Sequence, residues 1–199
     1  MTKRLIGFAL LVVALTTSIE GCSSTVSKPQ TAPTAAPSSA QTDQAVAGDI
    51  SDSTVYIPVS AASGAFSVKI PQGWSQSIST PITFTDKLNS VAFSQSPASA
   101  APTTASVTAS LVPILKSDGH HFTLKDVTTV TRAGGTAIRI RYSVDSAADA
   151  VTGKVARDAV EAYVFWKNGQ QAVLTLTGPD TADNVDPWMT VSDSFRWTA

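Results

Sequence analysis

Short runs of alternating hydrophobic and polar residues, separated by turn-forming residues, fill the C-terminal part of the chain. Val55 to Val59 and Ala65 to Ile70 flank the turn-forming segment Ala61 to Gly64, and this pattern predicts a β-hairpin. Ile82 to Thr85 and Ser90 to Ser94 predict a second antiparallel pair, joined by a short turn. The folded domain is therefore expected to begin near Val55.

The clearest hairpin signal lies near the C-terminus. Ala159 to Trp166 and Gln171 to Thr177 are separated by Asn168-Gly169, whose residues tolerate the positive φ angles of a tight turn. Gly134-Gly135 predicts another turn, which precedes the strand Thr136 to Val144. Side chains in that strand alternate between two faces, with Ala137, Arg139 and Arg141 on one and Ile138, Ile140 and Tyr142 on the other.

Three further segments complete the predicted fold. Ala105 to Leu115 has hydrophobic residues at alternate positions, which predicts another strand, whereas Leu124 to Thr131 fits either a short helical turn or an irregular strand. Thr181 to Asp186 supplies acceptors and negative charge for the start of a helix, and Pro187 suits its first turn. Residues recur at helical spacing after it: Trp188, Val191 or Ser192, and Phe195.

These elements predict an α+β domain. Its antiparallel β-sheet has about six to seven strands, packed with a C-terminal helix and with one more short helix as an option. Connecting loops are predicted at Ser96 to Thr104 and at Asp145 to Lys154.

The N-terminus has the pattern of an exported lipoprotein. Lys3 and Arg4 precede an apolar run that is too short to span a bilayer, so residues 1–21 are predicted to be a signal peptide. Ile19 and Gly21 before Cys22 resemble a bacterial lipobox, although Glu20 departs from the pattern. Cys22 is therefore the expected lipidation site, carrying a diacylglyceryl group with fatty acids such as palmitate. Ordinary secretion with a free thiol is the alternative.

Residues 22–54 are predicted to form a flexible tether between this anchor and the domain, which spans residues 55–199. The segment after Cys22 is almost wholly Ser, Thr, Ala, Pro, Gln and Asp, so burial cannot offset the entropy of ordering it. Its root-mean-square reach is roughly 30 Å. We expect the domain to stand at the extracytoplasmic face of the cell membrane.

Composition excludes several classes of function. The formal net charge is −1 and the basic residues are scattered among acidic ones, which argues against a nucleic-acid partner. Cys22 is the only cysteine, so no intramolecular disulfide or cysteine-rich metal site can form. Serines are abundant, but no G-x-S-x-G motif is present. We therefore expect no enzyme, no catalytic residues and no cofactor.

The remaining candidates for binding chemistry each have a structural alternative. His120-His121 beside Asp118 could contribute to a metal site or form a solvated loop, and the loop is favoured because a closed site needs three or four ligands. Arg139 and Arg141 are expected on the outer sheet face, where they could pair with Glu161 or bind a partner, and the salt bridge with Glu161 is favoured. Four tryptophans could form a stacking platform for a sugar or lipid, and three aspartates could support acid/base or calcium chemistry. Core packing is favoured for the first set, and helix capping with a solvated face for the second: Trp74, Trp166, Trp188 and Trp197; and Asp183, Asp186 and Asp193.

Several of these features occur in a familiar order. The domain resembles the PsbP-like fold, and more narrowly the actinobacterial LpqN/LpqT-type lipoproteins, in three motifs: Ile70-Pro71-x-Gly73-Trp74, Lys167-Asn168-Gly169, and Pro187-Trp188 followed by Val191, Ser194 and Phe195. The resemblance implies an α/β/α sandwich in an envelope protein that acts through binding partners, and it implies no catalytic motif. The expected function is a membrane-anchored, non-enzymatic module that binds a cell-envelope protein, or alternatively a lipid or glycan in a pocket between sheet and helix.

Overall fold

The computed structural model describes residues 46–78, 80–149 and 151–198. The predicted signal peptide, Cys22 and the tether up to residue 45 lie outside the described residues. In the described part, seven strands form one antiparallel sheet, which in spatial order contains β3 (Ser75–Ser77), β4 (Ile82–Thr85), β5 (Ser90–Pro97), β9 (Gln170–Pro179), β8 (Arg157–Lys167), β7 (Gly135–Asp145) and β6 (Thr123–Arg132).

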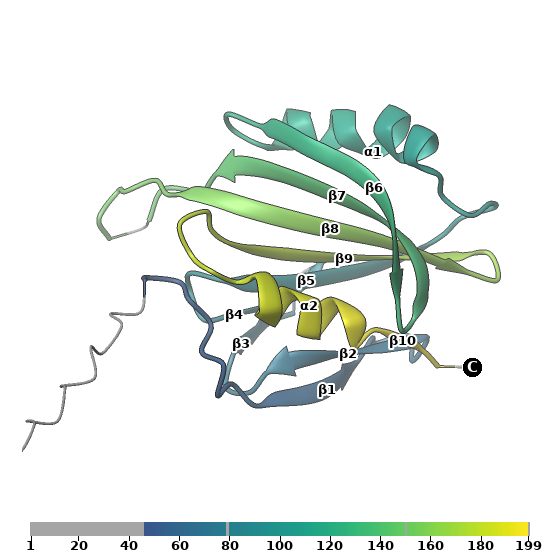
Figure 1. Cartoon of the computed structure of the whole chain (residues 1–199), viewed down its shortest axis with the longest axis horizontal. Helices are drawn as coiled ribbons and strands as arrows, with labels where there is room; N and C mark the ends of the chain where they lie inside the picture. Colours follow the sequence, from purple (N-terminus) through teal and green to yellow (C-terminus); the bar gives the residue numbers. More distant parts are fainter. Residues whose placement is uncertain (1–45, 79, 150, 199) are drawn as a thin grey trace, which may run out of the picture. The chain divides into compact units, whose positions relative to one another are not determined.

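A smaller sheet and two helices cover this large sheet (Figure 1). The smaller sheet has three antiparallel strands, β1 (Tyr56–Ser60), β2 (Phe66–Pro71) and β10 (Arg196–Trp197), and the helices are α1 (Thr104–Asp118) and α2 (Val185–Asp193). The predicted α+β class with an antiparallel sheet and a C-terminal helix is confirmed. The first predicted hairpin also forms, but as part of the separate small sheet.

Local sequence explains most of the strand pairing. The tight turn between β8 and β9 has Asn168 and Gly169 at φ angles of 49° and 80°, and it sets a regular register between these two strands. The sequence of Leu124 to Thr131 fitted either a helical turn or a strand, and in the structure this segment is part of the strand β6. Its pattern was irregular because a β-bulge interrupts the pairing with β7 between Leu124 and Asp126.

One predicted strand is wrong: Ala105 to Leu115 lies within the helix α1. A capping box starts this helix, because the Thr103 side chain accepts from the Ser106 N–H and the Ser106 side chain accepts from the Thr103 N–H. Val107, Leu111 and Leu115 are four residues apart, so all three pack on the sheet. The alternation at every second residue was incidental to this helical spacing.

Both faces of the large sheet are covered. One face packs against α1 through an apolar cluster that includes Val107, Ile138 and Ile140. The other face packs against the small sheet and α2, where aromatic rings dominate the core. The rings of Phe165 and Phe195 are stacked with centroids 4.0 Å apart, and Phe66 stacks on Phe195 at 5.0 Å. This second face continues beyond the aromatic rings into a polar region.

The folded domain extends N-terminally beyond the predicted boundary at residue 55. Ile50 joins the core, and its N–H donates to the Asn184 side chain at 2.9 Å. The side-chain amides of Asn89 and Asn184 both donate to the Gly48 carbonyl oxygen at 2.9 Å. Residues 46–54, assigned to the tether from composition, therefore contact the domain, because buried asparagines satisfy their backbone groups.

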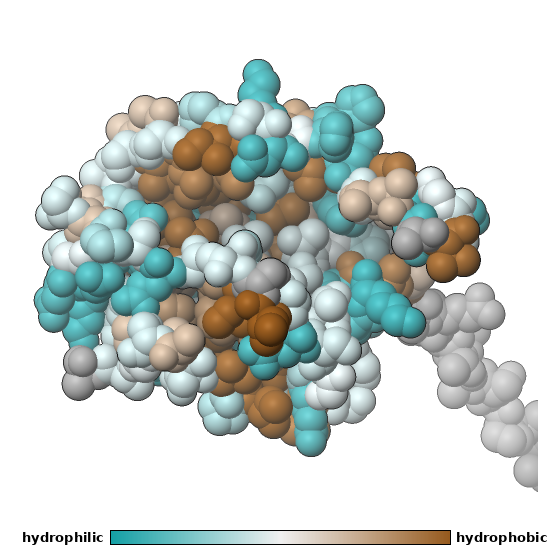
Figure 2. Space-filling view, turned by 180° about the vertical axis from the view of Figure 1, so that it is seen from behind, coloured by the Kyte–Doolittle hydropathy of each residue, from teal (hydrophilic) through white to brown (hydrophobic). Residues whose placement is uncertain are grey.

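Hydrophobic side chains on the surface are interspersed with hydrophilic ones on the face seen from behind (Figure 2). The most exposed large hydrophobic residues, Ile78 and Val151, are 93% and 92% exposed and lie in connecting loops. Within the described ranges, no helix combines the length and the apolar character needed to span a membrane.

Candidate functional site

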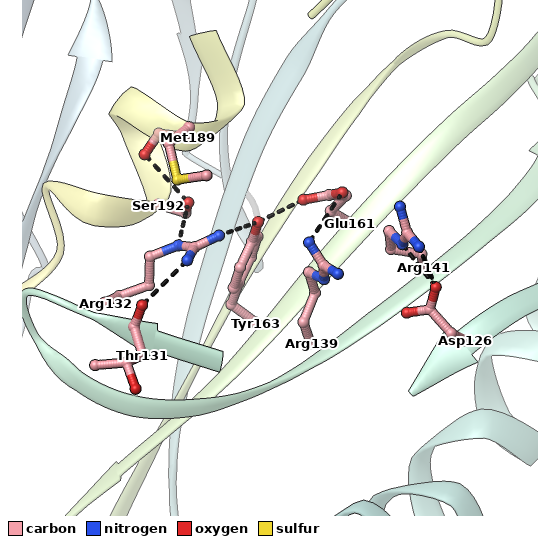
Figure 3. Close-up of polar contacts among 9 residues, drawn as sticks. All are labelled: Asp126, Thr131, Arg132, Arg139, Arg141, Glu161, Tyr163, Met189 and Ser192. Carbon is pink, nitrogen blue, oxygen red and sulfur yellow. Dashed lines mark hydrogen bonds and ion pairs between the residues drawn. The ribbon is translucent and has the colours of Figure 1, made fainter. Parts of the chain in front are cut away.

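A small cavity opens between α2 and the sheet face formed by β6, β7 and β8. Its volume is about 190 Å³. Four basic side chains contribute to its lining: Lys125, Arg132, Arg139 and Arg141. We call this cavity, together with the acidic partners of these side chains, the arginine recess. Figure 3 shows its polar contacts, which extend from Ser192 on α2 across the sheet to Asp126 on β6.

Strand alternation places the arginines on this face. Arg139 and Arg141 share a face with Ala137, which packs in the aromatic core, whereas their neighbours on the strand face α1. The expectation that they lie on an outer sheet face is wrong, because α2 and the small sheet cover part of that face. The Arg139 side chain is only 21% exposed, and that of Arg141 is 44% exposed.

The β-bulge in β6 adds a further cation to the recess. Leu124 pairs with Tyr142 and Asp126 pairs with Arg141, so Lys125 is the extra residue between them. A bulge of this kind redirects side chains locally. Lys125 consequently lines the recess although Asp126, its neighbour in sequence, also points to the arginine-bearing face.

Arg132, Tyr163 and Glu161 form a chain of contacts from α2 into the recess. Arg132 Nε donates to Ser192 Oγ at 3.0 Å, and its guanidinium donates to the Tyr163 hydroxyl at 3.3 Å. That hydroxyl donates in turn to Glu161. Burial, followed by this bond to Glu161, raises the pKa of Tyr163 above its ordinary value. Tyr163 therefore stays protonated and fixes the orientation of the Glu161 carboxylate.

Arg141 is committed to a different carboxylate. Its Nε donates to Asp126 Oδ2 at 2.8 Å, and a second nitrogen of the same guanidinium donates to that oxygen. The hydrogen bond from Arg141 lowers the pKa of Asp126, which keeps the carboxylate ionised. This pair therefore contributes a fixed, internally neutralised element at one side of the recess.

Arg139 differs from the other two arginines because it has no hydrogen bond to any described residue. Its nearest acidic contact is Glu161, with 3.8 Å between Arg139 Nη1 and Glu161 Oε1. Its Nε is buried and has no hydrogen-bond partner among the described residues. Two oxygens on the neighbouring strand β6, Asp126 Oδ1 and Thr128 Oγ1, are also buried and have no hydrogen-bond partner among the described residues. Buried polar groups without partners cost free energy. The Arg139 guanidinium, which lines the cavity, therefore keeps donors that no described residue accepts from.

The electrostatic balance of the recess favours an anion. Four cations (Lys125, Arg132, Arg139, Arg141) face two carboxylates (Asp126 and Glu161), which leaves a formal charge of +2 in a chain whose net charge is −1. The rim on α2 is apolar. Val185 and Met189 are 70% and 47% exposed there, above the buried Trp188. The recess therefore combines a cationic floor with an exposed hydrophobic edge.

The histidine pair lies elsewhere, in the turn that precedes β6. His121 has a positive φ of 50°, and its Nδ1 is 2.5 Å from Asp145 Oδ2. Arg157 contacts the other oxygen of Asp145 at 3.0 Å, and the pKa of Asp145 is lowered by the hydrogen bonds from His121 and Arg157. Across the described residues, no group of three metal-ligating side chains occurs. His120 is exposed, as expected for a solvated loop.

Three of the four tryptophans pack in or against the aromatic core and do not form an exposed stacking platform. Trp188 is buried, Trp74 and Trp197 pack against the aromatic core, and Trp166 donates from Nε1 to the Ala98 carbonyl oxygen at 2.9 Å. The three C-terminal aspartates also have separate positions: Asp186 lies in the first turn of α2, the Asp183 N–H donates to Asp49, and Asp193 accepts from the Ala133 N–H.

Three residues of the recess were predicted from the sequence as a possible paired or partner-binding group: Arg139, Arg141 and Glu161. Four others were not predicted: Lys125, Asp126, Arg132 and Tyr163. Arg132 could have been found, because the Gly134-Gly135 turn places it opposite Gly135 and so on the face of Ala137 and Arg139. Asp126 could have been found in the same way, because the pairing continues without interruption from the turn to Asp126 opposite Arg141. Lys125 could not be placed, since it is the extra residue of the bulge. Cys22, the predicted lipidation site, lies outside the described residues.

Comparison with known proteins gives a fold. No protein-family model matches the sequence, and no curated protein sequence matches it. Among solved structures, the chain is similar to cyanobacterial PsbP (CyanoP) from Synechocystis sp. PCC 6803, with 14% identity, coverage of 76% of this chain and 99% of that chain, and a TM-score of 0.51. This likeness confirms the PsbP-like fold that the sequence motifs implied.

Two further structures are less similar. LpqN of Mycobacterium tuberculosis, which is involved in cell envelope biogenesis, has 16% identity, coverage of 74% of this chain and 93% of that chain, and a TM-score of 0.46. The Ran-binding protein Mog1p of Saccharomyces cerevisiae has 13% identity, coverage of 64% and 78%, and a TM-score of 0.44.

Proposed function

We propose that this chain is an exported lipoprotein, held at the extracytoplasmic face of the cell membrane by acyl chains on Cys22, whose domain is a non-enzymatic binding module for a cell-envelope protein. The arginine recess carries the proposal. It places the largely buried guanidinium of Arg139, which has an ion pair with Glu161 but no hydrogen bond to a described residue, below exposed hydrophobic residues on α2. Such a combination of charge and apolar surface is typical of a protein-binding hot spot.

The size of the recess favours a protein partner over a lipid or glycan. Pockets that enclose a small molecule have volumes of roughly 300–1,000 Å³. The recess has about 190 Å³, enough for one functional group, and much of its floor is charged. An acyl chain would have to displace water from several charged side chains, which is unfavourable. A side chain projecting from a partner protein suits this volume.

The state of the ionisable groups favours binding over proton transfer. Asp126 has a lowered pKa because Arg141 donates to it, so it is a weak base. Tyr163 has a raised pKa because it is buried and bonded to Glu161, so it is a weak acid near neutral pH. Both groups are fixed by internal pairing, and this arrangement presents constant charge to a ligand.

Site-specific cross-linking in the native membrane tests the binding module. A photoreactive amino acid replaces Met189, at the rim of the recess, or Ile114, an exposed residue of α1 on the other side of the large sheet. We expect a discrete protein adduct from position 189 and none of the same mass from position 114. Equal labelling from both positions, or adducts with lipid alone at position 189, would contradict the protein-partner proposal.

The anchor is tested separately by Cys22→Ser. Two acyl chains hold a protein far more stably than one, at about 0.8 kcal/mol per buried methylene. We expect the parent chain to fractionate with the membrane and the variant to be released. A variant that remains with the membrane as the parent does would show that the attachment does not depend on Cys22.

A further inference from the structure

We infer that the arginine recess is a receptor for one carboxylate, supplied by an Asp or Glu side chain of the partner protein, and that Arg139 is the residue that binds it. This inference rests on the proposed function and adds the chemistry of recognition. It assigns different roles to three arginines that share one sheet face. Arg132 and Arg141 position the recess, while Arg139 contacts the ligand.

The hydrogen-bond inventory distinguishes Arg139 from its neighbours. Arg132 donates to Ser192, to the Thr131 carbonyl oxygen and to Tyr163. Arg141 donates to Asp126 from two nitrogens. Arg139 makes no hydrogen bond to a described residue, and its side chain is only 21% exposed, so water access is restricted. An incoming oxyanion would supply the acceptors that its planar donor fork requires.

Glu161 explains why Arg139 remains available. This carboxylate directs Oε2 to the Tyr163 hydroxyl, and its Oε1 stays 3.8 Å from Arg139 Nη1. The Tyr163 hydroxyl is itself held by Arg132. Glu161 therefore forms an ion pair that offsets part of the charge of Arg139 without accepting a hydrogen bond from it. The recess is preorganised, because a ligand carboxylate can bind Arg139 without first breaking an internal bond.

The number of available donors selects a carboxylate over a phosphate. Charge alone does not, since the formal charge of +2 in the recess attracts a dianion more strongly than a monoanion. Arg132 and Arg141 already donate to internal acceptors, whereas Arg139 has no hydrogen bond to a described residue. One guanidinium matches the two oxygens of a carboxylate, and the additional oxygens of a phosphate would face the carboxylates Asp126 and Glu161. The small volume of about 190 Å³ also suits one side-chain group.

The apolar rim selects the source of that carboxylate. Val185 and Met189 project beside the opening, with 70% and 47% of their surface exposed. A free small acid would leave these residues in water, whereas an acidic side chain on a partner surface would bring apolar neighbours that cover them. The matching partner surface therefore has an Asp or Glu surrounded by hydrophobic residues.

Arginine-selective NMR on the full-length lipoprotein in detergent micelles tests this inference. The probe is N-acetyl-glutamate methylamide, and inorganic phosphate is titrated in a second arm. We expect the Nε–Hε signal of Arg139 to shift and saturate with a dissociation constant on the order of millimolar, as suits a fragment of this size. Arg139→Gln should weaken binding about tenfold or more, since it removes the charged donor.

Arg157→Gln is the matched control. Arg157 lies on β8 and is already bonded to Asp145, Thr123 and the His121 carbonyl oxygen, so its replacement should leave probe binding unchanged. The inference is overturned if the Arg139 signal does not respond, if Arg139→Gln binds the probe as the parent does, or if phosphate binds more tightly. A cross-linked partner at Met189 combined with a silent Arg139 would retain the proposed function and reject the carboxylate receptor.

Discussion

The two faces of strands β7 and β8 have the same alternating pattern but different contents. On the face toward α1, Ile138, Ile140 and Val164 are nearly completely buried in an apolar cluster. On the opposite face, the aromatic core gives way to Arg139 and Glu161, which are only partly exposed and lie below α2. Both faces are covered by other elements, so coverage alone does not explain where charge occurs.

This difference distinguishes side chains that stabilise the fold from side chains that we propose bind a ligand. Apolar side chains on the α1 face gain stability simply by leaving water, at about 25 cal/mol per Å². Half-buried arginines gain little in this way and require hydrogen-bond acceptors, which Arg139 lacks among the described residues although it is paired with Glu161 at 3.8 Å. A binding site is a physical reason for keeping such a residue. Stability and binding should therefore respond differently to substitutions on the two faces.

The largest expected effect is on the aromatic end of the recess-bearing face. Phe195 is fully buried and stacks on both Phe165 and Phe66. Phe195→Ala should lower the free energy of unfolding by about 3–5 kcal/mol, because it removes the ring and leaves a cavity. Urea denaturation monitored by circular dichroism measures this change. A loss below about 1 kcal/mol would show that the rings do not form the core of this face.

A smaller loss is expected where the N-terminal segment joins the domain. Asn184 is 4% exposed and bonds the Ile50 N–H, the Gly48 carbonyl oxygen and Asn89. Asn184→Ala leaves the Ile50 N–H and Asn89 Oδ1 without these bonds, although Asn89 still donates to the Gly48 carbonyl oxygen, and it should cost about 1–3 kcal/mol. Amide hydrogen exchange at Ile50 should also accelerate. Unchanged protection at Ile50 would mean that the segment does not depend on this side chain.

Asp158, an acidic residue at the margin of the α1 face, is a position where substitution should increase the stability of the domain. Burial, and then the nearby Asp180 and Asp145, raise the pKa of Asp158 above its ordinary value of 3.8. The folded state thus prefers the protonated form, and stability falls as pH rises through the interval between the unfolded and folded pKa values.

Asp158→Asn should consequently raise the melting temperature at pH 7. The gain should disappear below the ordinary aspartate pKa of 3.8, where the parent side chain is already protonated in both states. Thermal unfolding at the two pH values measures the difference. A variant that is less stable than the parent at pH 7 would reverse the sign and show that ionised Asp158 has favourable partners.

The smallest expected effect on stability is in the recess itself. Arg139→Met removes a guanidinium without hydrogen-bond partners among the described residues but also removes the long contact to Glu161, so the two effects oppose each other. The free energy of unfolding should change by less than about 1 kcal/mol. Ile140→Ala, at the next residue on the opposite face, should cost about 2–5 kcal/mol in the same denaturation experiment. Comparable losses at both positions would indicate that Arg139 is structural.

Local sequence patterns were sufficient for much of the fold but not for the recess. The Asn168-Gly169 turn and the alternation through Ile138 and Ile140 predicted three strands correctly, because both signals act over a few residues. The helix over Val107 and Leu111 was missed because residues two and four apart were both apolar. Short segments can satisfy both periods, and tertiary packing decides between them.

The recess could not be predicted in the same way, because it is formed by residues that are far apart in the sequence. Glu161 and Arg139 were recognised as neighbours from strand pairing, but the covering helix α2 comes from residues much later in the chain. The bulge that redirects Lys125 has no reliable local signature. The availability of Arg139 depends on how Tyr163 holds Glu161, which is a property of side-chain geometry in the folded state.

The most direct test of this account is the yield of the Met189 cross-link in native membranes, compared between the parent chain and Arg139→Gln at equal levels of folded protein. The account predicts a discrete protein adduct in the parent and its loss in the variant, since the partner's carboxylate would have no donor to bind. The same adduct at the same yield in both would contradict it.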